Sequence, residues 1–231
     1  MGKYIMAMVK VVEEITVYTT AGFSTAYDYT NDKFLYQKNA DAKAYPASTT
    51  KIITALAAVK YAPLDLKITV GDELDVMYEG SSPGTAGSKK GQVWTLRQLL
   101  YAMLLPSGND AANVTAIKLA GSMEAFADLM NERACEMGLS RTFFVTPSGL
   151  DSEEHYTTAY DLAKLAAFAL NNNEFKTAAQ SYSATLHYGN PPYRRTLTNH
   201  NKLLKGYEGL IGVKTGFTKK AGRCLVSAAE R

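Results

Sequence analysis

The pattern of apolar and polar residues divides the chain into strand-like segments near both ends and longer helical segments between them. Alternating runs that predict β-strands lie at 16–18, 24–29, 33–36, 210–214 and 223–228. Apolar runs that predict helices lie at 47–59, 95–105, 122–137 and 158–170. This order predicts one domain over 1–231 with an α/β lobe, at about 1–60 and 175–231, and an all-helical lobe, at about 61–174. We expect a site between the two lobes.

Length and composition agree with a single folded unit. The chain has 231 residues, of which 46% are hydrophobic, enough for one large core or for two closely packed lobes. The formal net charge is only +3, so the charge gives no reason to expect a nucleic-acid partner. Cys135 and Cys224 lie far apart in the sequence, and they can either pair in an oxidising compartment or remain free thiols.

No metal or other cofactor is expected. His155, His187 and His200 show no ligand spacing with one another or with the cysteines, and we expect His200 to be structural. No apolar run is long enough to span a membrane. The first residues also lack the cleavage site of a signal peptide.

The candidate chemistry begins after Pro46, where Ser48 and Lys51 lie three residues apart at the start of an apolar helix. Residues at this spacing share one helix face. A serine hydroxyl needs a base beside it to act as a nucleophile, and burial and the helix dipole both lower the pKa of a lysine there. Ser48 and Lys51 are therefore a candidate nucleophile and base. A capping serine followed by a solvated lysine is the commoner explanation of this spacing alone.

A second polar group, Ser107-Gly108-Asn109, follows a helix that Thr95 caps and Pro106 ends. A tight corner between two packed helices can direct both side chains into a cleft. There Ser107 could relay a proton to a leaving group, and Asn109 could hold Lys51 and a substrate amide. The structural alternative is an ordinary turn, since Ser, Gly and Asn are residues that turns favour.

A third group, Lys214-Thr215-Gly216, ends the strand that starts at 210. Strand alternation directs Lys214 and Gly216 to one face and Thr215 to the other. Lys214 and Thr215 could bind a carboxylate, and glycine at 216 allows close approach of a substrate backbone. The N–H groups of Ser48 and Phe217 are candidate oxyanion donors. The structural alternative is an edge strand protected by a lysine.

The three motifs together are much more specific than any one of them, because Ser-x-x-Lys, Ser-x-Asn and Lys-Thr-Gly form the set found in penicillin-binding proteins and class A β-lactamases. Over about 36–231 the chain resembles the D-alanyl-D-alanine carboxypeptidases, low-molecular-weight penicillin-binding proteins of the peptidase S11 family. The blocks that carry this resemblance lie at 38–41, 46–52, 104–112, 144–150, 198–204 and 213–218.

The resemblance implies a fold similar to penicillin-binding proteins, an antiparallel sheet flanked by helices plus an all-helical lobe. It implies a serine-type D-Ala-D-Ala carboxypeptidase that needs no metal or cofactor. Ser48 would be the acylated nucleophile and Lys51 its base. The partners would be peptidoglycan stem peptides ending in D-Ala-D-Ala and β-lactams such as penicillins. The implied catalytic residues are Ser48, Lys51, Ser107 and Asn109, and the implied substrate-binding residues are Lys214, Thr215, Gly216 and Phe217.

Two other functions share these motifs. A class A β-lactamase uses an extra glutamate to activate water, but the segment 141–150 has no acidic residue and the first one is Asp151. Fast β-lactam turnover is therefore not expected. A silent wall-binding or β-lactam-sensing module would use the pocket only to bind, and the intact motifs argue against it. Arg194, Arg195 and Arg223 are candidates for an extra carboxylate contact, and the sequence does not distinguish among them.

The resemblance also bears on location and on the chain ends. Family members act outside the cytoplasmic membrane, so we expect an extracytoplasmic protein in trimmed form, whose native form is membrane-associated through segments absent here. The family's sheet continues beyond a segment like 223–231 into one more apolar strand and a C-terminal helix, and the residues at 2–9 resemble that strand. One hypothesis is circular permutation, with 5–8 pairing antiparallel with 225–227. The other is truncation with an unrelated leader.

Overall fold

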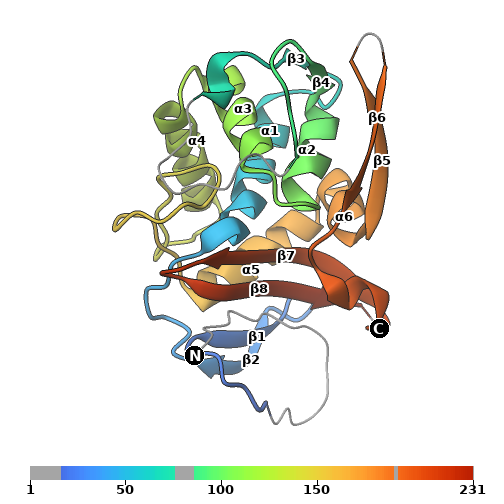
Figure 1. Ribbon diagram of the computed structural model, residues 1–231. Coiled ribbons are helices and arrows are strands. Elements are labelled where there is room, and N and C mark those ends of the chain that lie inside the picture. The colour runs from blue at the N-terminus through green and yellow to red at the C-terminus, as the bar shows by residue number, and fades with distance from the viewer. Residues whose placement is uncertain (1–16, 76–85, 190–191, 231) are drawn as a thin grey trace.

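The computed structural model describes residues 17–75, 86–189 and 192–230 (Figure 1). Its strands are β1 (Ser24–Asp28), β2 (Lys33–Lys38), β3 (Lys67–Thr69), β4 (Val93–Thr95), β5 (Ser183–Tyr188), β6 (Tyr193–Thr198), β7 (Leu210–Thr218) and β8 (Gly222–Ala229). Its helices are α1 (Lys51–Tyr61), α2 (Leu96–Leu104), α3 (Asn109–Ala120), α4 (Met123–Glu136), α5 (Ala159–Leu170) and α6 (Asn173–Gln180). Three 3₁₀ turns complete the list: η1 (Ala47–Thr50), η2 (Asp72–Leu74) and η3 (Lys202–Lys205).

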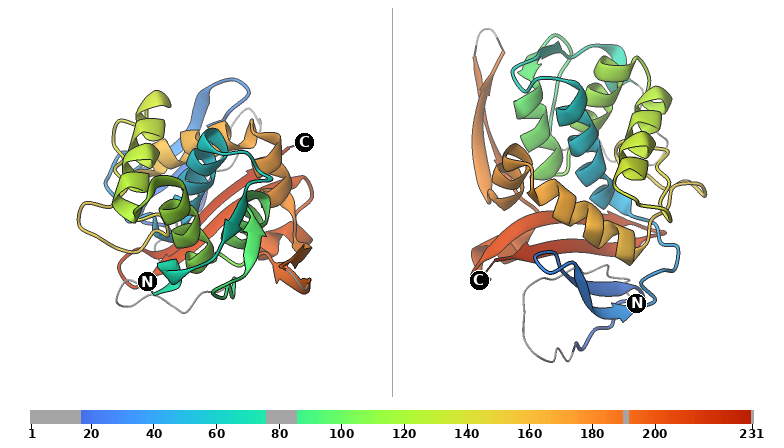
Figure 2. Two further views of the ribbon diagram at one scale, coloured as in Figure 1. Left: turned by 90° about the horizontal axis from the view of Figure 1, so that it is seen from above. Right: turned by 180° about the vertical axis from the view of Figure 1, so that it is seen from behind.

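The long antiparallel pair β7–β8 crosses the middle of the molecule, with helices α1 to α4 on one side of it and β1–β2 on the other (Figure 1). Seen from behind, α5 and α6 cover one face of this pair (Figure 2). The predicted α/β class with antiparallel strands, flanking helices and a helical group is confirmed. The C-terminal pair therefore meets the helical group along β7, which contacts η1 and α1.

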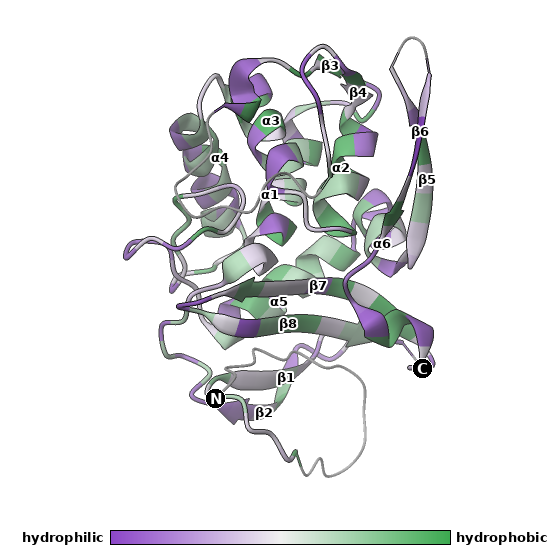
Figure 3. Ribbon diagram, viewed as in Figure 1, coloured by the Kyte–Doolittle hydropathy of each residue, from purple (hydrophilic) through white to green (hydrophobic). Residues whose placement is uncertain are grey.

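Helix α1 lies at the centre of the packing. It packs against α2, α3, α4 and α5, and its residues from Lys51 to Ala58 are all buried. The hydrophobic colour follows α2 and α5 as well (Figure 3), in agreement with the buried leucines and alanines of these helices. Burial of this much apolar surface is the main force that holds the helical group together. It also removes from water any polar group that α1 carries.

Side-chain caps start the helices where the sequence predicts them. Thr95 caps α2 in a capping box, because its side chain accepts from Gln98 N and the Gln98 side chain accepts from Thr95 N. Ser122 caps α4 and Thr158 caps α5 without a capping box, since their side-chain oxygens accept from Ala125 N and Asp161 N. The predicted helix starts at these three positions are confirmed.

Other predicted boundaries differ from the structure. Val17 and Tyr18 are not in a strand, and Thr16 lies outside the described residues. The chain at 47–50 forms the 3₁₀ turn η1, and the α-helix begins only at Lys51. The hairpin β5–β6, the short pair β3–β4 and the helix α6 were not predicted. The strands β3 and β4 have three residues each, which is too short to show a period in the sequence, and this explains why the pair was not predicted.

Several expectations concern the whole chain. The segment 5–8 lies outside the described residues, so its pairing with 225–227 stays a hypothesis. The division into two lobes stays a prediction, and α5 packs on both β1 and β8. Cys135 is exposed and Cys224 is buried, and both are free thiols. Across the described ranges, no helix has the length and apolar character needed to cross a bilayer.

Candidate active site

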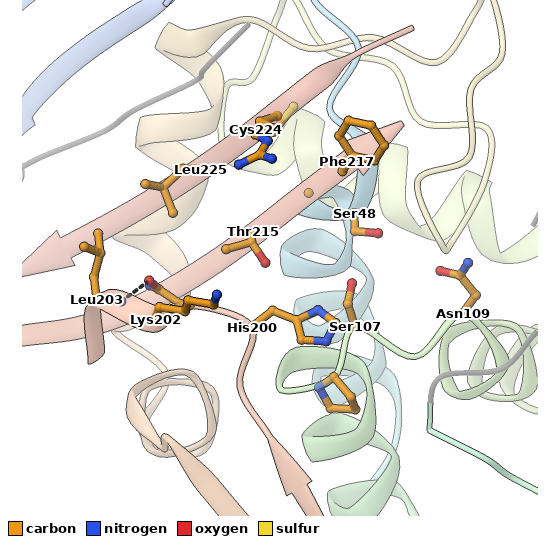
Figure 4. A pocket seen from close by; sticks show the side chains of 14 residues that line it. Ser48, Ser107, Asn109, His200, Lys202, Leu203, Thr215, Phe217, Cys224 and Leu225 are labelled. Atoms are coloured by element: carbon orange, nitrogen blue, oxygen red, sulfur yellow. Dashed lines mark hydrogen bonds between the residues drawn. The ribbon is translucent and has the colours of Figure 1, made fainter. Parts of the chain in front are cut away.

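A cleft of about 660 Å³ opens where β7 passes the start of α1 and the loop between α2 and α3 (Figure 4). This size lies within the range of small-molecule and peptide sites. Six of the eight predicted site residues line it: Ser48, Ser107, Asn109, Thr215, Gly216 and Phe217. The other two, Lys51 and Lys214, are buried close by. Its remaining lining residues are Pro106, His200, Asn201, Lys202, Leu203, Arg223, Cys224 and Leu225.

The turn η1 presents Ser48 to this cleft. Ala47, the first residue of this turn, has a φ of 49°, and Gly149 packs directly against it. A methyl group on Gly149 would lie 2.0 Å from the Ala47 carbonyl oxygen, so only glycine fits there. The loop that contains Gly149 therefore packs against the residue before Ser48 and supports the Ser48 backbone. Its N–H is in the first turn, where N–H groups have no partner within the helix.

Lys51 is fully buried and its amine has three neighbours. Its Nζ atom lies 3.0 Å from Ser48 Oγ, 2.7 Å from Asn109 Oδ1 and 2.6 Å from the Ser148 carbonyl oxygen. Burial lowers the pKa of Lys51 well below its ordinary value, Lys214 lowers it further, and Asp110 opposes the shift. The structure thus favours the neutral amine.

As an ammonium, Lys51 donates to all three oxygens. In the neutral form that a base requires, one of these three bonds must reverse its direction. A neutral amine has two N–H groups and one lone pair. The Asn109 Oδ1 and Ser148 carbonyl oxygens can only accept, so they take the two N–H groups. The lone pair then remains for the hydroxyl proton of Ser48. This arrangement is that of a general base beside its nucleophile.

The corner between α2 and α3 carries Ser107 and Asn109. A Cβ atom on Gly108 would lie 2.7 Å from Ala86 Cβ and 2.8 Å from the Ala102 carbonyl oxygen, so the corner needs glycine. Ser107 has a φ of 61°, an uncommon conformation for a residue other than glycine. Its buried Oγ atom has no hydrogen-bond partner among the described residues. It is therefore available to a bound molecule.

Strand β7 brings Lys214 and Gly216 to the inner face and Thr215 to the outer one. Lys214 is 1% exposed, and its Nζ atom donates to the Thr215 carbonyl oxygen at 2.9 Å. Burial lowers the pKa of Lys214 to about 7. A methyl group on Gly216 would lie 2.9 Å from Ser48 N, so the glycine lets β7 run against η1. Phe217 follows with its side chain 65% exposed.

Sequence reasoning missed the residues that support the site. The Ser148 carbonyl holds Lys51, but a backbone oxygen leaves no mark in a sequence. His155 is buried: its Nε2 atom lies 2.8 Å from Thr50 Oγ1, and its Nδ1 atom accepts from Val145 N at 2.9 Å. Burial lowers the pKa of His155 to about 4, so the ring is neutral. The block at 144–150, whose role the sequence left open, thus braces the start of α1.

The candidate arginines and Asp151 differ in whether they line the cleft. Arg194 and Arg195 belong to β6 and do not line the cleft, whereas Arg223 does. Asp151 accepts from Thr218 Oγ1 at 2.8 Å and is not a lining residue. The part of the cleft wall that the structure describes contains no acidic side chain. No group of three metal-ligating side chains occurs within the described ranges.

The chain is similar to known proteins of one family. Residues 10–231 match the family model described as D-alanyl-D-alanine carboxypeptidase, peptidase S11. The chain is 37% identical over 204 residues to the D-alanyl-D-alanine carboxypeptidase DacF of Bacillus subtilis (strain 168), covering 86% of this chain and 51% of that protein. It is 36% identical over 209 residues to the D-alanyl-D-alanine carboxypeptidase of Streptomyces sp. (strain K15), covering 85% of this chain and 72% of that one.

Solved structures show the same likeness. The Streptomyces K15 DD-transpeptidase superposes with a TM-score of 0.85 at 33% identity, covering 95% of this chain and 88% of that one. The D-alanyl-D-alanine carboxypeptidase DacD from Francisella tularensis superposes with a TM-score of 0.83 at 26% identity, covering 96% of this chain and 66% of that one. The chain spans about half the length of the Bacillus subtilis relative, 51%.

Proposed function

The chain belongs to the D-alanyl-D-alanine carboxypeptidase family, peptidase S11, and from this premise we propose that it removes the terminal D-Ala from peptidoglycan stem peptides through an acyl-enzyme on Ser48. The observation that carries the proposal is the contact of Lys51 Nζ with Ser48 Oγ at 3.0 Å, in surroundings whose burial lowers the pKa of the lysine well below its ordinary value. A hydroxyl with a neutral amine beside it is an activated nucleophile.

Acylation begins when Lys51 accepts the Ser48 hydroxyl proton. Ser48 Oγ attacks the carbonyl carbon of the penultimate D-Ala, and the carbonyl oxygen becomes an oxyanion. The N–H groups of Ser48 and Phe217 are placed to stabilise it, because Gly216 brings β7 against η1. The C–N bond then breaks. The leaving amine takes up the proton through Ser107, whose Oγ atom has no partner among the described residues.

Hydrolysis completes the cycle. Water attacks the ester carbonyl carbon and gives a proton to Lys51, which returns it to Ser48 Oγ as the ester bond breaks. The described cleft wall holds no carboxylate that could activate the water separately, as a class A β-lactamase requires. In the penicilloyl ester the leaving amine stays attached to the acyl group and does not vacate the cleft. This ester is therefore expected to persist. These features favour a penicillin-binding carboxypeptidase over a β-lactamase.

Lys214 and Thr215 are the proposed contacts of the terminal carboxylate. Thr215 lines the cleft, and Lys214 lies behind it with its amine on the Thr215 carbonyl. The substrate class places the activity outside the cytoplasmic membrane, where peptidoglycan is. We propose the same location for this protein, with β-lactams as ligands of the same serine.

The test is intact mass spectrometry during incubation with benzylpenicillin, with Ser48→Ala as the matched control. We expect a persistent adduct of one penicillin on the wild type and none on Ser48→Ala. Release of D-Ala from a peptide ending in D-Ala-D-Ala is then measured. We expect release by the wild type and not by the variant.

The other outcomes identify the alternatives. A persistent adduct without D-Ala release would indicate a β-lactam-sensing module. Consumption of the drug without an adduct would indicate a β-lactamase. If the drug stays intact and no adduct forms, the proposed function is wrong.

A further inference from the structure

The segment 86–88 packs against the corner that carries Ser107, and two charged side chains outside the cleft wall hold it: Asp110 of α3 and Arg195 of β6. We propose that Asp110 and Arg195 are positioning residues, which fix this segment on the corner and so keep the Ser107 hydroxyl where the leaving amine takes up its proton. The inference rests on the proposed function, since it concerns the proton relay of that mechanism.

Asp110 binds the segment through its carboxylate. The side chain is buried, with 3% exposure, and its Oδ1 and Oδ2 atoms accept from Ala86 N at 3.2 Å and from Ser88 N at 2.9 Å. Within the described residues no ion pair includes Asp110. A buried carboxylate needs hydrogen-bond donors, and charge-assisted bonds of this kind are stronger than neutral ones. The start of α3 and the segment 86–88 are therefore held together.

The segment packs on the one residue between Ser107 and Asn109. A Cβ atom on Gly108 would lie 2.7 Å from Ala86 Cβ and 2.9 Å from Asp110 Oδ1. Ser107 itself has a φ of 61°, and a residue other than glycine keeps such a conformation only where its surroundings hold it. If the segment is released, the Ser107 backbone can relax, and its Oγ atom then moves.

Arg195 holds the same segment from the β5–β6 hairpin. It lies on β6 opposite Leu186, and its Nη1 atom donates to the Gly87 carbonyl oxygen at 3.4 Å. Gly87 has a φ of 68°, and a Cβ atom there would overlap the guanidinium, so the side chain packs on the bare glycine. The chain after β6 contacts the corner again, because His200 N donates to the Leu105 carbonyl oxygen at 3.1 Å. The hairpin thus supports the corner at two points.

The leaving atom of the substrate decides how far the reaction depends on Ser107, which lines the same cleft as Ser48 (Figure 4). In a peptide the C–N bond breaks, and the nitrogen must take a proton, which passes from Lys51 through Ser107 Oγ. In a thioester the C–S bond breaks, and the sulfur leaves as a thiolate without a proton, because thiols ionise near pH 8.5. A displaced Ser107 should therefore slow the peptide and spare the thioester.

The experiment compares two substrates with the same acyl group. One ends in D-Ala, and the other ends in 2-mercaptopropionate, which keeps the carboxylate and the methyl group and replaces only the leaving nitrogen by sulfur. The quantity measured is the ratio of kcat/KM for the peptide to kcat/KM for the thioester. A change in Lys51 alters the attack of Ser48 on both substrates, so it cancels in this ratio.

The variants are Asp110→Asn, Arg195→Gln and, as the reference, Ser107→Ala. We expect Ser107→Ala to lower the ratio by about 10²-fold, the effect of losing a general acid. Asp110→Asn should lower it by about tenfold, since misplacement of a catalytic group costs less than its removal. Arg195→Gln should lower it by about threefold, because one hydrogen bond is weakened. In the Ser107→Ala background Asp110→Asn should lower it no further, since the two residues act as a unit.

Each variant has a matched control. Asp161 is also a buried carboxylate in the first turn of a helix, and it accepts from Arg141 N at 2.9 Å, but it does not line the cleft. Asp161→Asn should lower the stability and leave the ratio unchanged. Arg194 is the exposed neighbour of Arg195 on β6 and lies opposite His187. Arg194→Gln should leave the ratio unchanged as well.

Four results would overturn the inference. They are an unchanged ratio in Asp110→Asn and Arg195→Gln, a parallel loss of both substrates, an equal fall in Asp161→Asn, and an additional fall in the Ser107→Ala background. If Asp110→Asn does not fold, Arg195→Gln decides, because its side chain is only partly buried.

The proposed function is judged separately. It survives each of these results if benzylpenicillin still acylates Ser48 of the wild type. A wild type that hydrolyses neither substrate and forms no adduct would refute the function and this inference together.

Discussion

Single residues decide the chemistry of this site, and two buried lysines are the clearest case. Lys51 and Lys214 are both almost fully removed from water, and no carboxylate pairs with either amine within the described residues. An unpaired buried ammonium is strongly destabilised, so burial lowers the pKa of both groups, that of Lys214 to about 7. The sequence predicted this for Lys51, because its neighbours on α1 are apolar. Its acceptors, by contrast, come from distant segments that only the fold brings together.

The first prediction concerns Lys51 as the base. Lys51→Arg should lower the rate of acylation by benzylpenicillin by about 10²-fold to 10⁴-fold, since a guanidinium stays protonated and cannot accept the Ser48 proton. In the wild type the rate should rise with pH and level off well below 10.5, because the pKa of Lys51 is lowered by burial. The measurement is adduct formation by mass against time at a series of pH values.

A matched control for this variant is Lys60→Arg, on the same helix but outside the cleft, where Lys60 pairs with Glu136. It should acylate at the wild-type rate. Wild-type acylation by Lys51→Arg would exclude Lys51 as the base.

The second prediction concerns His155 and folding. Burial lowers the pKa of this ring to about 4 from an ordinary 6.5, so folding favours the neutral form. The stabilisation is complete above pH 6.5 and is lost as the pH falls towards 4. The difference corresponds to about 3 kcal/mol of unfolding free energy. Urea unfolding at a series of pH values should show this loss.

The loss is assigned to His155 by substitution. His155→Gln should flatten the pH dependence between 6.5 and 4, whereas the exposed His187→Gln should leave it unchanged. An equally steep fall in His155→Gln would assign the effect to carboxylates elsewhere.

At the scale of elements, the sequence predicted helix starts well and short strands poorly. Thr95, Ser122 and Thr158 marked three helices, because a capping side chain acts within its own turn. The β5–β6 hairpin was missed, since its strands are largely solvent-exposed and its apolar positions are few. The motif Lys214-Thr215-Gly216 was correctly predicted to lie on a strand, but its distance from η1 depends on tertiary packing. Local patterns predict the elements, and the contacts between β7 and η1 require the fold.

The third prediction tests this contact between elements. A methyl group at Gly216 would lie 2.9 Å from Ser48 N and 3.1 Å from Ala47 Cβ, so Gly216→Ala should push β7 away from η1. Displacement of the oxyanion donors by about 1 Å is expected to slow acylation by about 10²-fold. Overpacking should also lower the unfolding free energy by about 1–3 kcal/mol.

The control is Gly206→Ala, because an added methyl there meets no atom within 4 Å. It should acylate at the wild-type rate. Unchanged acylation in Gly216→Ala would show that the close approach of β7 is not needed.

At the scale of the whole molecule, the site is assembled from segments that are remote in sequence. Ser48 precedes α1, Asn109 starts α3, Ser148 lies in a later loop and Lys214 lies on β7. A sequence can give the chemistry of each motif, but their meeting in one cleft follows from the packing of α1 against the other helices. The strand edges raise a further question. Within the described residues β1 pairs only with β2 and β8 only with β7, although α5 packs against both β1 and β8.

The last prediction follows from these edges and tests the permutation hypothesis. A strand between β1 and β8 would pair the backbone groups of both. If the segment 4–9 supplies it, replacing Ile5, Met6 and Met8 by Ser should lower the unfolding free energy by more than about 3 kcal/mol, because buried residues of this size each contribute about 2–5 kcal/mol. The controls Lys3→Ser and Lys10→Ser should change it little. A triple variant within about 0.5 kcal/mol of the wild type in urea unfolding would contradict this pairing of the segment.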